Sequence, residues 1–315
     1  MFYMSVTWKK FNALGTEVII SAALSNDQAV FLDKAEKSIK DFEKYFSRFI
    51  PGNELDKFNQ AAEGKIKVSE PMFKMLEAAK QWQEFSQGTF DPTIINNLEQ
   101  LGYDKSFTEI DSTESNDKLD LAKLSNEFIT RPRLDKLIIF NTEVFKPANL
   151  RLDFGGFGKG YIVDQISHDI FSGVANYWLG AGGDLLVSGS QDNQVGWRIG
   201  VQNPYEPSQE IFSLNTKGAK LGIATSGIFQ RQGIKDGKAW HHLIDPRTGM
   251  PVDNNILAVT AIADSAVKAD ILAKTVLILG ETAGLEFIEK KSETAVLIFL
   301  KNGGIVFSSR VKNYL

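Results

Sequence analysis

One glycine-rich segment has the residue types and spacing to bind an anion. It reads RLDFGGFGKGYIVDQ over residues 151–165, with an apolar run before it and a helix-like pattern after it. Glycine lacks a Cβ atom, so the backbone at Gly155, Gly156 and Gly158 can approach a ligand closely. The start of a helix presents free N–H groups and a positive dipole end, and Lys159 adds a cation there. The segment therefore indicates a phosphate site, although a tight structural loop with a solvated lysine has the same composition.

A second group of candidate residues lies in the last quarter of the chain. His242 and Asp245, in the segment WHHLIDPRTG, offer a general base and a carboxylate close together in sequence. Asp270 and Lys274 are four residues apart in an apolar run, so they share one face of the helix predicted there. A charged pair in so apolar a helix favours a position at a site. The structural alternatives are an exposed ion pair, and a histidine bonded to a backbone carbonyl.

Three further motifs have the glycine, hydroxyl or acidic content of binding loops. They are GTFDPT at residues 88–93, LGAGGD at residues 179–184 and ATSG at residues 224–227. Each is equally compatible with an ordinary structural turn, and the DPRTG segment at 245–249 in particular has good turn chemistry. No one of these motifs decides a function by itself.

The composition limits the class of protein. The chain has 315 residues, of which 43% are hydrophobic and 23% charged, with a formal net charge of −4 and no cysteine. The charge gives no field that favours nucleic acid, and the absence of cysteine excludes disulfides and thiolate metal sites. No segment approaches the length of a transmembrane helix, and neither a signal-peptide pattern nor a lipid-anchoring cysteine is present. We therefore expect a cytoplasmic protein, or an exported one if a leader is missing from the sequence as given.

The apolar pattern predicts the elements that position these residues. Helical spacing predicts helices at 27–49, 69–86, 161–171 and 265–279, with Ser69 as one N-cap and Asp264 or Ser265 as another. Strand patterns occupy 11–23, 136–145, 150–154, 177–189, 196–202, 212–216, 221–226 and 258–262, and a hairpin is predicted at 295–308. The polar, irregular sequence near residues 105–135 indicates a small irregular excursion from the fold. Since the helices are grouped early and strands dominate the second half, the pattern favours an α+β layered fold.

Taken in order, the motifs resemble those of one family, the FAD:protein FMN transferases. This ApbE family was formerly labelled as thiamine-biosynthesis lipoproteins. The matching segments between Leu14 and Gly280 are LGTEV, FSRF with NELDKFN, GTFDPT with LGY, LDFGGFGKGYIVD, LGAGGDLLVSG, WRIGVQNP, IATSG, HHLIDPRTGMPV and ADILAKTVLILG. Their joint order and spacing are specific. The resemblance implies a layered α/β sandwich with a T-fold-related core, either as a single domain over residues 1–315 or as two lobes with the FAD site between them.

The resemblance also implies an activity and its residues. It implies binding of FAD and transfer of the FMN moiety to a threonine or serine hydroxyl of an acceptor flavoprotein, with AMP released and magnesium shielding the phosphates. Family acceptors carry that hydroxyl in a short motif resembling Asp-Gly-x-Thr-Ser-Ala-Thr. The implied cofactor contacts are Leu14, Phe49, Thr89, Phe90, Asp91, Asp153, Lys159, Asp184, Ser226, His242 and Leu243, and we add Lys274 as a cofactor contact of our own prediction. The implied catalytic residues are His242 as candidate base and Asp270, which would hold the metal together with the carbonyl of Gly156.

One departure from the family pattern bears on the chemistry. Lys274 stands where the family usually has a threonine that helps to hold the metal, and an ammonium cannot ligate a cation. Thr275 lies about 100° further around the helix and is not an easy substitute. We therefore expect the Lys274 ammonium to lie where the metal would lie and to pair with Asp270. Two alternatives to a transferase stay open: a non-catalytic FAD-binding homologue, and an FAD pyrophosphatase that yields FMN and AMP.

Overall fold

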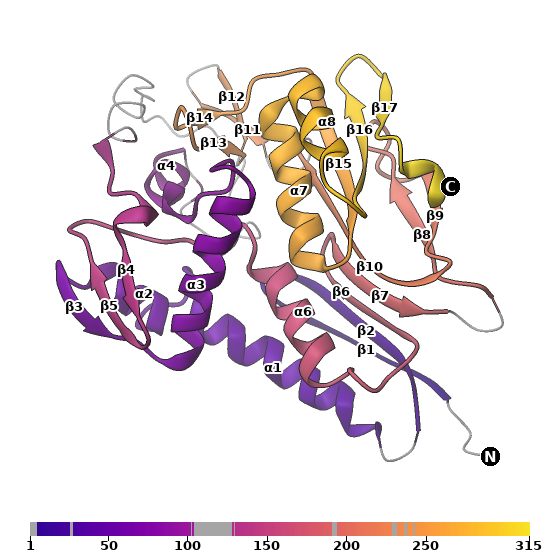
Figure 1. Cartoon of the computed structure of the whole chain (residues 1–315), viewed down its shortest axis with the longest axis horizontal. Helices are drawn as coiled ribbons and strands as arrows, with labels where there is room; N and C mark the ends of the chain where they lie inside the picture. The colour runs from indigo at the N-terminus through magenta and orange to yellow at the C-terminus, as the bar shows by residue number, and fades with distance from the viewer. Residues whose placement is uncertain are drawn as a thin grey trace. The chain divides into compact units, whose positions relative to one another are not determined.

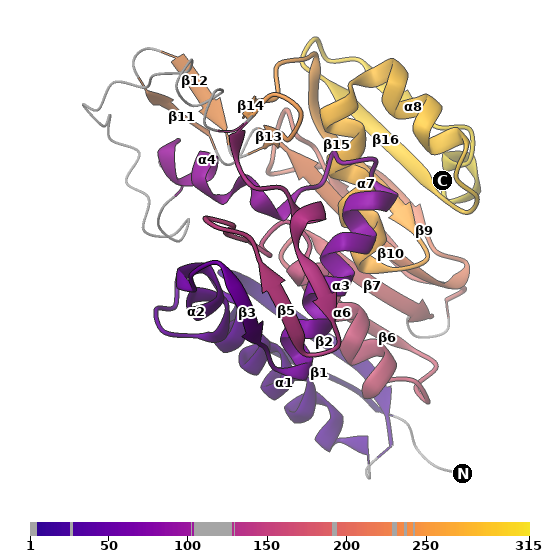
Figure 2. The same ribbon diagram turned by 60° about the vertical axis from the view of Figure 1, so that its left-hand side comes forward.

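The chain forms two compact units. The computed structural model describes residues 5–25, 28–101, 103, 128, 130–190, 194–228, 232–235, 238–241 and 243–315. Unit 1 comprises Met1–Glu43, Phe157–Phe229 and Asn254–Leu315, and unit 2 comprises Lys44–Gly156 and Gln230–Asp253. Unit 2 is thus built from two segments that interrupt the sequence of unit 1. Figure 1 and Figure 2 show the elements of both units.

Unit 1 is built on an eight-stranded sheet with the strand order β1-β2-β6-β7-β10-β15-β16-β17. All neighbouring strands are antiparallel. The strands are β1 (Ser5–Ala13), β2 (Thr16–Leu24), β6 (Tyr177–Ala181), β7 (Asp184–Gly189), β10 (Gly218–Gly227), β15 (Ile256–Ala263), β16 (Ala295–Leu300) and β17 (Ile305–Phe307). The central strand β15 reads ILAVTAIA and is buried along almost its whole length. Such a run is expected of a strand that is covered on both faces of its sheet.

Helices cover one face of this sheet, and a β-hairpin covers the other. The helices are α1 (Val30–Phe46), α6 (Gly158–Asp169), α7 (Ala266–Leu279) and α8 (Glu281–Glu289). The short η5 (Val311–Asn313) belongs to the hairpin side, because Val311 packs in the core cluster of the hairpin. The hairpin is β8 (Arg198–Gln202) with β9 (Glu210–Asn215). Strand alternation divides the core between the two faces: Leu186 packs in the cluster with α1 and α6, whereas Leu185 and Val187 pack with the hairpin.

Helices α6 and α7 are held together by a close backbone approach and by a shared cap. A Cβ atom at Gly160 of α6 would lie only 2.6 Å from Val267 Cα at the start of α7. Asp164 of α6 accepts hydrogen bonds from the backbone N–H groups of Ala266 at 2.8 Å and Val267 at 2.9 Å. The Ser265 side chain adds the usual N-cap bond, to the N–H of Lys268. Helix α6 therefore fixes where α7 begins.

Unit 2 combines short helices with small sheets. Its helices are α2 (Glu54–Gln60), α3 (Glu70–Phe85), η2 (Pro92–Ile94), α4 (Ile95–Gln100) and η4 (Leu134–Lys136). Its strands are β3 (Gly64–Lys67), β4 (Ile138–Phe140), β5 (Glu143–Lys146), β11 (Gln232–Lys235), β12 (Lys238–His241), β13 (Ile244–Asp245) and β14 (Met250–Pro251). They form a three-stranded sheet of order β3-β5-β4 and two ribbons, β11-β12 and β13-β14. Leu98, Leu101 and Ile244 form a small core between α4 and the β13-β14 ribbon.

The predicted α+β layered fold is confirmed, with its helices at 30–46, 70–85, 158–169 and 266–279. Ser69 and Ser265 are N-caps, as predicted, and Gly280 lies directly between α7 and α8. No helix among the described residues is long and apolar enough to cross a membrane. Most of the predicted excursion near 105–135 lies outside the described residues, and its described end contains η4.

Four of the strand predictions were wrong in detail. The patterns at 11–23, 136–145 and 177–189 are each interrupted by a turn, because tight turns at residues 14–15, 141–142 and 182–183 let the apolar alternation continue into the next strand. Residues 150–154 form no strand. Their backbone is instead held by Asn59 of α2, whose side chain donates to Leu152 O at 2.9 Å and accepts from Leu152 N at 2.8 Å.

Candidate functional site

Two carboxylates and two lysines of unit 1 form what we call the charge cluster. Its members are Asp270 and Lys274 on α7, Asp184 at the start of β7 and Lys159 in the first turn of α6. The Lys274 ammonium donates a hydrogen bond to Asp270 Oδ1, as the spacing of four residues predicted. Lys159 Nζ lies 3.1 Å from Asp184 Oδ2. The sequence thus predicted the members of the cluster and one of its two ion pairs.

The carboxylates of the charge cluster lie deeper than its ammonium groups. The side chains of Asp184 and Asp270 are 4% and 2% exposed, whereas those of Lys159 and Lys274 are 21% and 17% exposed. The lysine side chains are therefore the partners nearer to solvent in the two ion pairs, and the aspartates are the more buried partners. A buried carboxylate is tolerated only when a counter-charge compensates it.

In each carboxylate of the cluster, one oxygen atom accepts no hydrogen bond among the described residues. Asp184 Oδ2 and Asp270 Oδ2 are buried and have no hydrogen-bond partner within the described part of the chain. The Lys159 ammonium is within ion-pair distance of Asp184 Oδ2 but does not have the angles of a hydrogen bond. Burial raises the pKa of Asp270, the nearby Asp184 charge raises it further, and Lys274 and Lys159 oppose both effects. The site therefore responds strongly to any added or removed positive charge.

In unit 2, the segment before the glycine loop is tied to an aromatic cluster. Asp153 accepts a hydrogen bond from Gly155 N at 2.8 Å, and its other oxygen lies 3.5 Å from Arg48 Nε. The Arg48 guanidinium lies over the rings of Phe49 at 4.4 Å and Tyr103 at 4.7 Å. Phe49 is 38% exposed, so a planar aromatic ligand has an apolar ring available to stack on.

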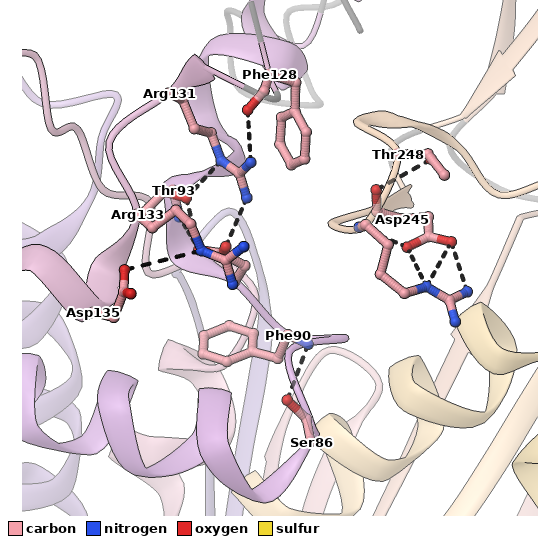
Figure 3. Close-up of polar contacts among 11 residues, drawn as sticks. Ser86, Phe90, Thr93, Phe128, Arg131, Arg133, Asp135, Asp245 and Thr248 are labelled. Atoms are coloured by element: carbon pink, nitrogen blue, oxygen red, sulfur yellow. Dashed lines mark hydrogen bonds and ion pairs between the residues drawn. The ribbon is translucent and has the colours of Figure 1, made fainter. Parts of the chain in front are cut away.

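The predicted residues Thr89, Phe90 and Gly156 meet at one place in unit 2. A Cβ atom at Gly156 would come within 3.2 Å of Phe90 Cε2, so the glycine loop lies directly against that ring. Ser86 holds the segment in place. Its carbonyl accepts from Thr89 Oγ1 at 2.9 Å, and its hydroxyl accepts from Phe90 N at 3.1 Å, the latter shown in Figure 3. A side chain at Gly156 would therefore have to displace the Phe90 ring by a few tenths of an ångström.

Asp91 has both carboxylate oxygens bound by protein donors. Oδ1 accepts from Thr93 N at 2.9 Å and from Thr93 Oγ1 at 2.7 Å, which caps η2. Oδ2 accepts from Arg131 at 2.7 Å, and Arg131 also donates to Thr93 Oγ1 and to the carbonyl of Phe128 (Figure 3). Its visible role is structural, and a contact from Asp91 to the cofactor stays a prediction.

The remaining predicted cofactor contacts are dispersed. Leu14 occupies the β1–β2 turn at a positive φ of 59°, and its N–H donates to Glu43 at 2.6 Å. Ser226 is buried near the end of β10. Leu243 is buried in unit 2, where its carbonyl accepts from Val252 N at 3.0 Å.

The turn interpretation of DPRTG is confirmed. Asp245 accepts from Arg247 N at 2.9 Å and binds the Arg247 guanidinium, with NH2 at 2.7 Å from Oδ2 (Figure 3). Its carbonyl also accepts from Thr248 N at 3.1 Å. His242, the predicted base, lies outside the described residues. Because the Asp245 carboxylate binds Arg247 within the turn, its observed role is to stabilise that turn.

The cavity found in unit 1 lies on the hairpin side of the sheet, away from the charge cluster. It has a volume of about 320 Å³ and is lined by apolar residues such as Trp178, Leu185 and Phe299 together with Thr225 and Thr260. Leu185 belongs to the core cluster of the β8-β9 hairpin, on the face opposite α6. None of the four charged residues of the cluster lines this cavity. The charge cluster and this cavity therefore lie on different faces of the sheet.

The sequence model of the ApbE family matches residues 14–298. The chain belongs to the ApbE family. It is 27% identical over 260 residues to an FAD:protein FMN transferase of Klebsiella pneumoniae, covering 81% of this chain and 77% of that protein. It is 24% identical over 297 residues to the enzyme of the same name from Haemophilus influenzae, covering 88% and 80%.

Solved ApbE structures share the fold. The ApbE protein of Thermotoga maritima superposes with a TM-score of 0.85 at 24% identity, covering 98% of this chain and 99% of that one. The flavin transferase ApbE of Vibrio cholerae gives a TM-score of 0.81 at 22% identity, covering 99% and 100%. At these identities the likeness establishes the fold.

The magnesium ion implied by the ApbE resemblance does not fit the charge cluster. Magnesium requires near-octahedral oxygen ligands at about 2.0–2.1 Å. Here the Lys274 ammonium holds Asp270 Oδ1, and the Lys159 ammonium lies beside Asp184 Oδ2. Among the described residues, no group of three or more His, Asp or Glu side chains could hold a metal ion. In this ApbE protein, both carboxylates of the charge cluster already have a lysine as their cationic partner.

Three residues that position the ApbE site were not among the sequence candidates. Asp164 caps α7, Arg48 contacts Asp153, and Arg131 neutralises Asp91. A lone acid in the apolar YIVDQ run was a signal for Asp164, and the FSRF motif contains Arg48. Arg131 gave no signal because its partner is 40 residues away in sequence.

Proposed function

We propose that this protein binds FAD and transfers its FMN moiety to a threonine or serine hydroxyl of an acceptor protein, releasing AMP. The family match and the curated relatives named FAD:protein FMN transferase support this activity. The structural observation that carries it is the arrangement at the start of α6. Lys159 lies in the first helical turn, and Phe157 provides no side-chain cap there. Helix N–H groups beside an ammonium suit a phosphate.

The reaction breaks the phosphoanhydride bond of the FAD pyrophosphate and forms a phosphoester bond to the acceptor. The acceptor hydroxyl oxygen attacks the phosphorus atom on the FMN side of the pyrophosphate and forms the new O–P bond. The bond from that phosphorus to the bridging oxygen breaks, and the oxygen leaves with AMP. The hydroxyl proton passes to a base, for which His242 stays the candidate from the sequence. Catalysis of this kind depends mainly on positioning and on neutralising charge.

The charge cluster is suited to that task. Ammonium groups bind phosphate oxygens through charge-assisted hydrogen bonds, and Lys159 and Lys274 are the members that reach toward solvent. Asp184 and Asp270 orient the two lysines. Phe49, Thr89, Phe90 and Asp153 are proposed as contacts of the flavin, because Phe49 offers an exposed ring and the other three are held rigidly by the bonds described above.

A flavinylation assay tests the proposal. The purified protein is mixed with FAD and an acceptor that carries the threonine motif, and a denaturing gel is inspected for covalent flavin fluorescence. We expect a fluorescent acceptor, together with AMP in equal amount, and no label on an acceptor whose threonine is replaced by valine. Free FMN with an unlabelled acceptor would instead identify a pyrophosphatase. Intact bound FAD would identify a flavin carrier.

A further inference from the structure

We infer that Lys274 replaces the divalent metal, so that two lysine ammonium groups, and no metal ion, bind the oxygen atoms of the FAD pyrophosphate. This inference rests on the proposed function, since it concerns the same site. It makes Lys274 a substrate-binding residue and predicts that both FAD binding and FMN transfer persist without magnesium.

The first argument is the layering of the charge cluster. A ligand that arrives from solvent meets Lys159 and Lys274 before it meets the nearly inaccessible carboxylates of Asp184 and Asp270. An ammonium has three N–H donors, and Asp270 takes one from Lys274. The donors of Lys274 therefore serve both its anchor and an incoming phosphate oxygen.

The second argument is charge balance. Two carboxylates and two ammonium groups have no formal net charge. Before FAD binds, a divalent cation added to this set would leave an uncompensated double positive charge in a largely buried place, which is costly. It would also have to break the Lys274–Asp270 hydrogen bond to gain a carboxylate oxygen. A phosphate oxygen need not displace a cation from a carboxylate, because it accepts hydrogen bonds from ammonium groups that are already in place.

The third argument comes from the carboxylate oxygens that lack a donor. Asp270 Oδ2 is buried without a hydrogen-bond partner in the described structure, so its compensation depends mainly on Lys274. If the Lys274 side chain is shortened to threonine, Asp270 keeps a buried charge, gains space and gains a neighbouring hydroxyl. Carboxylate and hydroxyl oxygens are ligands that magnesium accepts. Lys274→Thr should therefore acquire a dependence on magnesium that the natural protein lacks.

Three variants separate these effects. Lys274→Met removes the ammonium and keeps an apolar stem, and Lys274→Thr removes it and adds the hydroxyl. Lys268→Met is the matched control, because Lys268 is on the same helix, is 18% exposed and also pairs with an aspartate four residues away, Asp264. Thermal unfolding in EDTA and in magnesium chloride verifies that each variant is folded, and a higher unfolding temperature in magnesium chloride reports magnesium binding.

FAD affinity is then measured by flavin fluorescence in excess EDTA and in excess magnesium. We expect equal affinity for the natural protein and for Lys268→Met, and a loss of about tenfold or more for Lys274→Met in both buffers. Lys274→Thr should bind weakly in EDTA and recover in magnesium, which should also raise its unfolding temperature. A natural protein whose affinity falls tenfold in EDTA, or a Lys274→Met variant that binds like the natural protein, would overturn the inference.

The same samples separate this inference from the proposed function. FAD binding in EDTA without transfer to an acceptor in either buffer would refute the transferase activity and leave the role of Lys274 intact. Transfer that occurs only with magnesium would refute the role of Lys274 and leave the transferase activity intact. Failure to bind FAD in both buffers would refute both.

Discussion

Gly160→Ala tests whether the charge cluster depends on the close packing of α6 against α7. The added Cβ atom would lie 2.6 Å from Val267 Cα and 2.7 Å from Val267 N. These are backbone atoms at the start of α7, so no side-chain rotation can relieve the contact. Carbon atoms pack best at about 3.5–4.0 Å, and the two helices must therefore separate by about 1 Å.

The expected magnitude combines three effects. Overpacking of this kind costs about 1–3 kcal/mol. Alanine recovers about 1 kcal/mol because it is the better helix former. Separation of the helices also stretches the two hydrogen bonds from Ala266 and Val267 to Asp164, each worth about 1 kcal/mol. The net loss is about 2 kcal/mol, which corresponds to a fall in unfolding temperature of about 4–8 °C.

Circular dichroism during heating measures the change. Gly173→Ala is the matched control, because a Cβ atom there meets nothing within 4 Å and the variant should differ by less than about 0.5 kcal/mol. We also expect weaker FAD binding by Gly160→Ala, since Lys159 is its neighbour in α6. A variant that unfolds at the temperature of the natural protein would refute the close packing of these helices.

Two further predictions concern buried charges. Burial raises the pKa of Asp164 to about 6, above its unfolded value of 3.8. Because the folded state binds the proton more tightly, the free energy of unfolding falls as pH rises from the unfolded to the folded pKa. Between pH 4.5 and pH 7 the free energy of unfolding should fall by about 2 kcal/mol more in the natural protein than in Asp164→Asn; equal slopes in urea titrations would contradict this. Arg131→Met should lower the free energy of unfolding by about 3 kcal/mol, because it strands the buried Asp91 carboxylate. Arg133→Met breaks only the exposed pair with Asp135 (Figure 3) and should change the free energy of unfolding by less than about 0.5 kcal/mol. Equal effects of the two substitutions would argue against a buried Asp91–Arg131 pair.

The sequence predicted best what depends on neighbours along the chain. Helix α7 combines an apolar run, a serine cap and a following glycine, and all three signals act within one element. The Asp270–Lys274 pair was predictable for the same reason, because helical geometry alone places the two residues together. The order and spacing of the motifs then indicated the family by resemblance.

The sequence could not predict contacts that are created by packing. Lys159 and Asp184 lie 25 positions apart, and only the docking of α6 on the sheet brings them together. The strand predicted at 150–154 was wrong because its apolar residues are buried by tertiary contacts while Asn59 binds the backbone. The hairpin turns at residues 14–15 and 182–183 were missed because an uninterrupted alternation conceals a change of direction.

The central claim is that lysines supply the positive charge for FMN transfer in this protein. The most direct measurement is the rate of covalent flavin labelling of a threonine acceptor by the natural protein, in excess EDTA and in excess magnesium. Equal rates in the two buffers, with a strong loss in Lys274→Met and none in Lys268→Met, are the predicted result. Labelling that occurs only with magnesium would contradict the claim.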